Sequence, residues 1–142
     1  MNHLCRMLLT GYAVLPIGGC LDFLQPTQTT IQLVNDGSFA VEVTIYISGT
    51  QEIPRALLTT TGEKIERTVN AGTTVTIVRD CDELQAVVID DADLQIIGGI
   101  GPEADTEVLR DGTDFGCGDT IRFTFSSTLL PPSLDIDVSY PG

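Results

Sequence analysis

Residues 39–48 read FAVEVTIYIS, and this stretch decides the fold class. Its aliphatic side chains occupy every second position, at Val41, Val43, Ile45 and Ile47. Successive side chains of a strand point to opposite faces of a sheet, so this spacing buries one face and leaves the other in solvent. The β-branched residues favour a strand as well. We therefore expect a half-buried β-strand here.

The same two-residue period recurs on both sides of this strand. Residues 30–36 alternate and run into NDGS at 35–38, which is typical of a β-hairpin turn. The acidic run DDAD at 90–93 also indicates a turn. The segment 51–64 is ambiguous: Pro54 begins a helical turn, or the segment is a loop with a short edge strand. Further strands are indicated within 64–69, 73–80, 83–90, 94–101, 106–127 and 134–140.

This pattern predicts an all-β chain. About eight to ten short strands with turn signals every 8–12 residues or so are typical of an antiparallel β-sandwich, Ig-like or a related Greek key. The chain has no Trp, so the Cys–Trp–Cys core of immunoglobulin domains is missing and "Ig-like" describes the architecture only. We expect a single β-sandwich domain over residues 30–142.

The charge of the chain excludes one class of partner. Its 142 residues include 20 acidic and 7 basic side chains, for a net charge of −13. Binding to nucleic acid depends on clustered Lys and Arg that displace counterions from phosphates. Nucleic acid is therefore not an expected partner. The acidity serves solubility, or it serves binding of cations or of a basic protein.

The first 20 residues, MNHLCRMLLTGYAVLPIGGC, have the organisation of an export signal. Arg6 precedes the uncharged residues 7–19, a run too short for a membrane span of about 20 residues but long enough for the apolar part of a signal peptide. The run ends in Ile17, two glycines and Cys20, which resembles the lipobox of bacterial lipoproteins. A different secretory signal, or a buried N-terminal strand, is the alternative.

The lipobox resemblance implies an address. It implies a signal peptide at residues 1–19, cleavage before Cys20, and acyl chains on Cys20 that anchor the protein to a membrane. Residues 20–29 are then a short tether. The protein would lie in the cell envelope, facing the periplasm or the exterior, with an envelope protein as a possible partner. Leu21 rather than Asp follows the cysteine, which favours the outer membrane if one is present.

The cysteine count agrees with this address. Of four cysteines, Cys5 leaves with the signal and Cys20 carries lipid, so that Cys81 and Cys117 remain. Two cysteines can form one disulfide, which an oxidising compartment favours. The alternative is two reduced thiols. A zinc site is not expected, because two cysteines without a histidine do not make a usual ligand set.

Acidic clusters are the strongest candidate site. Ca²⁺ takes six to eight oxygen ligands, which Asp-rich loops with glycine can supply. A Cys81–Cys117 disulfide would bring the cluster of Asp80 and Asp82 close to the cluster of Asp111, Asp114 and Asp119. The alternative is that Asp and Gly are there for turn geometry. The candidate calcium ligands are Asp80, Asp82, Asp111, Asp114 and Asp119, and a third cluster holds Asp90, Asp91 and Asp93.

The residue types favour binding over catalysis. The only histidine is His3, within the signal, so Ser-His-Asp and Cys-His catalysis are not expected in the mature chain. We expect a non-enzymatic structural or protein-binding β-sandwich that needs no cofactor. One alternative is a calcium-dependent adhesion or ligand-binding module. Another is a carboxylate-based hydrolase, which would need a pair of acids together in a cleft.

Overall fold

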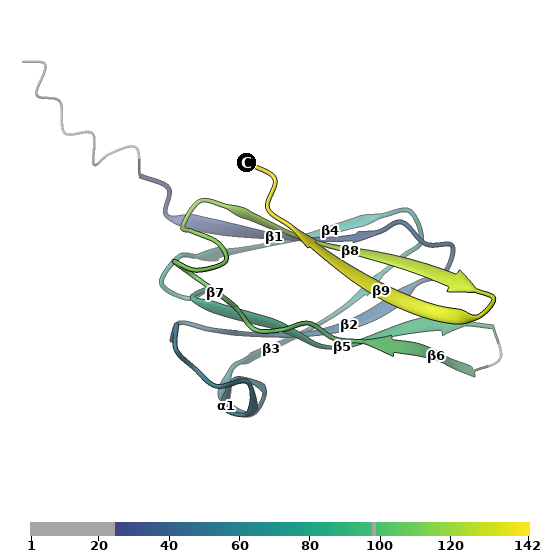
Figure 1. The fold of residues 1–142 in the computed structure, drawn as a ribbon. Coiled ribbons are helices and arrows are strands. Elements are labelled where there is room, and N and C mark those ends of the chain that lie inside the picture. The colour runs from purple at the N-terminus through teal and green to yellow at the C-terminus, as the bar shows by residue number, and fades with distance from the viewer. Residues whose placement is uncertain (1–24, 98) are drawn as a thin grey trace, which may run out of the picture.

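The computed structural model describes residues 25–97 and 99–142, where two β-sheets pack face to face around one core (Figure 1). The signal and Cys20 lie outside the described residues. The elements are β1 (Gln28–Asn35), β2 (Val41–Ser48), α1 (Arg55–Thr61), β3 (Glu63–Val69), β4 (Thr74–Asp80), β5 (Ala86–Ile96), β6 (Gly99–Ala104), β7 (Leu109–Arg110), β8 (Thr120–Leu129) and β9 (Pro132–Ser139).

The strand order confirms the predicted β-sandwich. The first sheet has the order β4-β1-β8-β9, and the second has the order β3-β2-β5-β6 with β7 paired to β5. One pairing departs from the antiparallel expectation: β1 is parallel to β8. A parallel pair needs a long connection, and here every strand from β2 to β7 lies between the partners. Turn residues indicate only where one strand connects to the next along the chain. They therefore cannot reveal a pairing between strands that are far apart in sequence.

The hairpin predicted at 35–38 is wrong. This segment carries the chain from the first sheet to the second, because β1 and β2 belong to different sheets. Asn35 fixes the crossing: its amide nitrogen donates hydrogen bonds to the carbonyl oxygens of Phe39 and Val69, each at 2.8 Å. Its side-chain oxygen accepts one from the Gly37 N–H at 2.9 Å. These residues thus stabilise a crossing between sheets, because Asn and Gly are suited to such a crossing as well as to a hairpin turn.

The core is made by the predicted inward positions. The four aliphatic residues of β2 are at most 2% exposed, and the aromatic Phe123 and Phe125 of β8 are fully buried. Each such side chain contributes about 1.5–3 kcal/mol by leaving water. In β9, Leu134 is buried whereas Ile136 and Val138 are only half-buried. This difference arises because β9 is an edge strand.

The ambiguous segment around Pro54 forms the helix α1. Pro54 stands immediately before its first residue, where a missing N–H costs nothing. Leu58 is fully buried and packs the helix on the outer face of the second sheet. This explains the continuous apolar run of β5, whose alternate residues contact two different clusters. The cluster under the helix comprises Ile53, Leu58, Ala86 and Val88.

The turn predicted at DDAD is also wrong, because β5 continues through it. The pairing with β2 skips Asp90, so that Ile89 and Asp91 oppose consecutive β2 residues. Such a β-bulge reverses the alternation of faces. Asp90 and Asp91 therefore both avoid the core, while Ala92 and Leu94 are fully buried. If Asp90 were instead paired in regular register, Asp91 would point inward and the aliphatic residues after it outward.

The strand register defines two ends of the sandwich. At the disulfide end, Gln28 of β1 lies opposite Asp80 of β4, and the described chain enters there. At the distal end, Asn35 lies opposite Phe125 of β8. Figure 1 shows the entering segment at one end and the β5–β6 and β8–β9 turns at the other.

Candidate functional site

The disulfide end is closed by the predicted covalent bond. Cys81 and Cys117 form a disulfide with their Cα atoms 5.4 Å apart. The Cys81 N–H donates to the Thr27 carbonyl at 2.9 Å. The Cys117 sulfur contacts the Pro26 carbonyl oxygen at 2.9 Å, without a hydrogen bond because a disulfide sulfur has no proton. Gly118 has φ +96°, and a Cβ there would collide with Pro26. The bond therefore clamps two loops onto the entering chain.

The acids proposed as calcium ligands lie around this bond. Asp82 is exposed and Asp111 is half-buried. Among the described residues, these five acids do not form a group of three whose carboxylates lie within 4.8 Å of one another. Calcium at this end stays a prediction. The other three accept hydrogen bonds: Asp114 from the Arg110 N–H at 2.7 Å, Asp119 from the Gly116 N–H at 2.6 Å, and Asp80 from the Gln28 side chain on the neighbouring strand at 3.1 Å.

A different group of acids converges on the outer face of the second sheet. Asp91, Asp93 and Glu103 each offer a carboxylate oxygen within 4.8 Å of the others. Asp93 lies directly opposite Glu103 on β6 and directly opposite Glu42 on β2. Like charges placed opposite each other across strands destabilise a sheet. We call Glu42, Asp91, Asp93 and Glu103 the acidic row, and it is the candidate site.

Burial intensifies the repulsion within the acidic row. Asp93 Oδ1 is buried and has no hydrogen-bond partner. Burial raises the pKa of the Asp91 carboxyl above its ordinary value, and Asp93 adds to the rise through its charge and a hydrogen bond. Asp91 therefore holds its proton to a higher pH than an isolated Asp. Chemically, the row can take up a proton or bind a cation.

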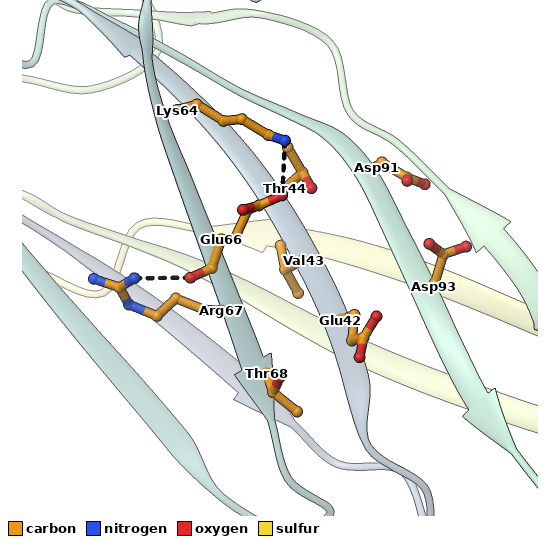
Figure 2. A pocket seen from close by; sticks show the side chains of 9 residues that line it. All are labelled: Glu42, Val43, Thr44, Lys64, Glu66, Arg67, Thr68, Asp91 and Asp93. Carbon is orange, nitrogen blue, oxygen red and sulfur yellow. Dashed lines mark hydrogen bonds and ion pairs between the residues drawn. The ribbon is translucent and has the colours of Figure 1, made fainter.

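Lys64, which lines the same depression as Asp91 and Asp93, is engaged elsewhere. Lys64 Nζ lies 2.7 Å from Glu66 on the same strand, and this hydrogen bond raises the pKa of Lys64. Figure 2 shows this pair on one side of a depression of about 480 Å³, with Asp91 and Asp93 across β2 on the other. In the part of the chain that is described, no Lys or Arg forms an ion pair with either of these acids.

The bulge marks the boundary of the site. Arg55, the first residue of α1, forms ion pairs with Asp90 at 3.1 Å and Asp105 at 3.0 Å. It also donates to the Thr106 carbonyl. This arginine neutralises the bulge residue and ties the helix to β5. The outer face is thus apolar under α1 and acidic beyond the bulge.

Sequence reasoning noted Asp91 and Asp93 but missed Glu103. The two aspartates were assigned to a turn, although they belong to a continuous strand. Glu103 follows the glycine-rich IIGGIGP at 96–102 and is not part of an acidic cluster in the sequence. Gly101 is required because a Cβ there would collide with the Leu94 carbonyl oxygen. The sequence offered one indication: if the residues before and after this turn are paired as two strands of a hairpin, Asp93 and Glu103 fall on the same face.

Comparison with known proteins adds no functional assignment. No protein-family model matches the chain, and no curated protein matches it in sequence. Among solved structures, the T6SS lipoprotein TssJ1 from Pseudomonas aeruginosa is 16% identical, with 82% of this chain and 98% of that chain covered and a TM-score of 0.42. The membrane-binding domain of pneumolysin is 9% identical, with 79% and 97% covered and a TM-score of 0.43.

Larger toxins match over a part of their length. The human-specific toxin intermedilysin is 12% identical, with 79% of this chain covered and a TM-score of 0.45, and the chain spans 23% of its length. A trapped toxin is matched over 24% of its length. Likenesses at these scores carry no argument about function, so the fold class rests on the strands themselves.

Within residues 25–97 and 99–142, no helix has both the length and the apolar character needed to cross a bilayer.

Proposed function

We propose that the chain is a cell-envelope lipoprotein, anchored through acyl chains on Cys20, whose β-sandwich binds another envelope protein and performs no catalysis. The observation that carries the proposal is the disulfide between Cys81 and Cys117. Disulfides persist in oxidising compartments and are rare in the cytosol. This bond supports export, which the lipobox-like sequence before Cys20 also predicts.

The position of the bond suits a protein held at its N-terminus. Cys81 and Cys117 contact Thr27 and Pro26, the residues of the tether that immediately precede β1. Only five residues lie between Cys20 and Pro26, so that the two are at most about 20 Å apart. Acyl chains on Cys20 would therefore keep the disulfide end close to the bilayer and leave the distal end pointing away from it.

The case for binding rather than catalysis rests on the available groups. No histidine follows His3, so the domain lacks the side chain that most often exchanges protons near neutral pH. The paired acids Asp91 and Asp93 lie beside an open depression on a sheet face. This arrangement differs from the enclosed pair that a carboxylate-based hydrolase would need.

The experiment is the intact mass of the protein extracted from membranes of its host. We expect a mass that begins at Cys20, is raised by acyl chains, and increases by two hydrogens on reduction. A Cys20→Ser variant should lose the acyl mass and leave the membrane fraction while keeping the disulfide. A soluble, unprocessed chain would overturn the anchor, and an unchanged mass on reduction would overturn the bond.

A second candidate function is calcium-dependent ligand binding. The convergence of Asp91, Asp93 and Glu103 favours it over solvated turn acids, because Asp93 Oδ1 is buried without a partner. Calcium at the acidic row would raise the melting temperature, and Asp93→Asn would abolish the rise while Asp119→Asn would not. The reverse result would assign calcium to the disulfide end. Equal melting temperatures in millimolar Ca²⁺ and in chelator would reject both.

A further inference from the structure

The most exposed aliphatic side chains of the described chain lie in two turns. Ile97, after β5, is 97% exposed, and Leu130, after β8, is 94% exposed, with Leu129 beside it at 48%. Single exposed aliphatic residues are ordinary on protein surfaces. Two almost fully exposed ones on different hairpins are informative when they lie at the same end of a molecule.

The topology brings these two turns to the distal end. β5 ends where β2 begins, since Leu94 lies opposite Val41. β8 passes the end of β1 at Phe125 and continues to the turn. β6 and β9, the strands that leave the two turns, are in contact. Figure 1 shows both turns together, at the opposite end from the entering chain.

Charge is absent from both turns in a strongly acidic chain. Residues 94–102 and 123–134 contain no Asp, Glu, Lys or Arg, although the net charge is −13. Polar backbone groups are also few in the second turn. Pro131 and Pro132 have no N–H, and the Thr128 hydroxyl, 2.7 Å from the Pro131 carbonyl oxygen, donates to it. Burying this turn against a partner would therefore leave few polar groups unpaired.

Acidic side chains border this uncharged surface. Asp93 lies four residues before Ile97 on β5, or about 13 Å along the strand, with Glu42 and Glu103 on either side of it. On β9, Asp135 lies opposite Ser126. An apolar centre with a charged rim is the usual anatomy of a protein-binding surface, and the sign of the rim selects the partner.

We infer that Ile97, Leu129 and Leu130 form a docking surface for an envelope protein that presents an apolar recess edged by Lys and Arg. This inference rests on the proposed function and specifies its partner. The charge next to the turns disfavours an anionic lipid surface. The anchoring membrane is also out of reach end-on, because Leu130 lies ten residues, about 33 Å, beyond Thr120 at the disulfide end, whereas the tether spans at most about 20 Å.

The test places a photoreactive phenylalanine analogue at residue 97 or 130 of the full chain in its host. Matched controls carry it at Leu57 or Val78, which are 49% and 44% exposed. We expect one and the same protein to crosslink from both turn positions and from neither control. The crosslinked partner peptide should contain aliphatic and basic residues. Reversing the rim with Glu42→Lys and Glu103→Lys should lower the yield about tenfold.

Three results would overturn the inference. They are equal crosslinking from the controls, an acidic partner peptide, or an adduct with a second copy of this chain. The lipid alternative is tested with Leu130→Trp, which supplies the only Trp of the chain. Its emission should not shift to the blue when the full chain is mixed with phosphatidylcholine vesicles, with or without phosphatidylglycerol. A blue shift would assign the surface to lipid.

These readouts are independent of the anchor. Acylation of Cys20 is read from the intact mass, and docking is read from the crosslink. A soluble chain that still crosslinks one basic-edged partner would reject the anchor and keep the docking surface. An acylated chain that gives no such adduct would keep the anchor and reject the docking surface.

Discussion

The two ends of the sandwich are built by different means. At the disulfide end, a covalent bond joins two loops to the entering chain, and carboxylates such as Asp114 and Asp119 bind backbone N–H groups. At the distal end, the turns that contain Ile97 and Leu130 are uncharged and project these aliphatic side chains into solvent. The comparison teaches that the covalent bond and the carboxylate hydrogen bonds lie at the opposite end of the strands from the exposed apolar surface.

The largest effect should come from deleting Ala92, which lies on the distal side of the bulge in β5. If the bulge persists, the deletion turns Asp93 into the core and Leu94 out of it, and if the bulge is lost instead, Asp91 turns into the core. Either outcome buries an unpaired carboxylate, which should cost about 4 kcal/mol or more, a large part of the roughly 5–15 kcal/mol by which a typical domain is stable. Circular dichroism and denaturant titration check this. Deleting Asp90 is the matched control, because it removes only the unpaired residue, keeps Ala92 and Leu94 inward, and should leave the domain folded.

The second effect tests the disulfide end. Replacing Cys81 and Cys117 together by Ala frees a loop with a sequence separation of 36 and should lower the free energy of unfolding by roughly 3–4 kcal/mol. Urea unfolding with and without reductant measures it. Reductant should leave the unfolding midpoint of the double variant unchanged and should lower that of the wild type. An unchanged midpoint in reductant would show that this end does not depend on its bond.

A smaller effect of opposite sign should appear in the acidic row. Asp91→Asn removes one of the crowded carboxylates and should stabilise the fold at pH 7 by about 0.2–1 kcal/mol, or roughly 1–5 °C in Tm. The pKa of Asp91 is raised in the folded state, so the wild type regains this stability as pH falls through that pKa toward the ordinary Asp range. The advantage of the variant should therefore vanish at low pH.

Thermal unfolding of both proteins from pH 7 to pH 4 measures this convergence. Asp137→Asn is a suitable control, because that carboxylate lies opposite Thr124 rather than another acid. A variant of Asp91 that is less stable than the wild type at pH 7 would show that the carboxylate is held by a favourable partner such as a bound cation.

The smallest effect on stability should come from the distal turns. Ile97→Ser and Leu130→Ser remove side chains that are already in solvent, so each should change the free energy of unfolding by less than about 0.5 kcal/mol. Urea titration checks this. A large loss would mean that these side chains pack against the domain, and the contrast between the two ends would disappear.

Alternation in the sequence was enough to predict the strands and the core. Ile45 in β2 and Phe123 in β8 are buried where the period of two requires. The sheet assignment could not be predicted, because Asn35 and Gly37 suit a hairpin and a crossing between sheets equally. The same holds for Asp90, since an acidic run favours both a turn and a bulge. Deciding between these outcomes requires the long-range partners of each strand.

The candidate site was predictable only in part, for the same reason. The disulfide followed from counting cysteines. The acidic row depends on Asp93 pairing with Glu103 and Glu42, and these three acids come from strands that the sequence does not pair. The carboxylates that the sequence favoured, such as Asp119, instead accept hydrogen bonds from their own loops.

The central place of β1 in its sheet has a mechanical consequence. The tether continues directly into β1, which has β4 on one side and β8 on the other. A pull between the anchor and a partner held at the distal end would act along the strand axis. The backbone hydrogen bonds on both sides of β1 would then be loaded in shear and would have to break together rather than one after another. If the chain is anchored and bound as proposed, the domain would transmit tension between a membrane and a partner without unravelling.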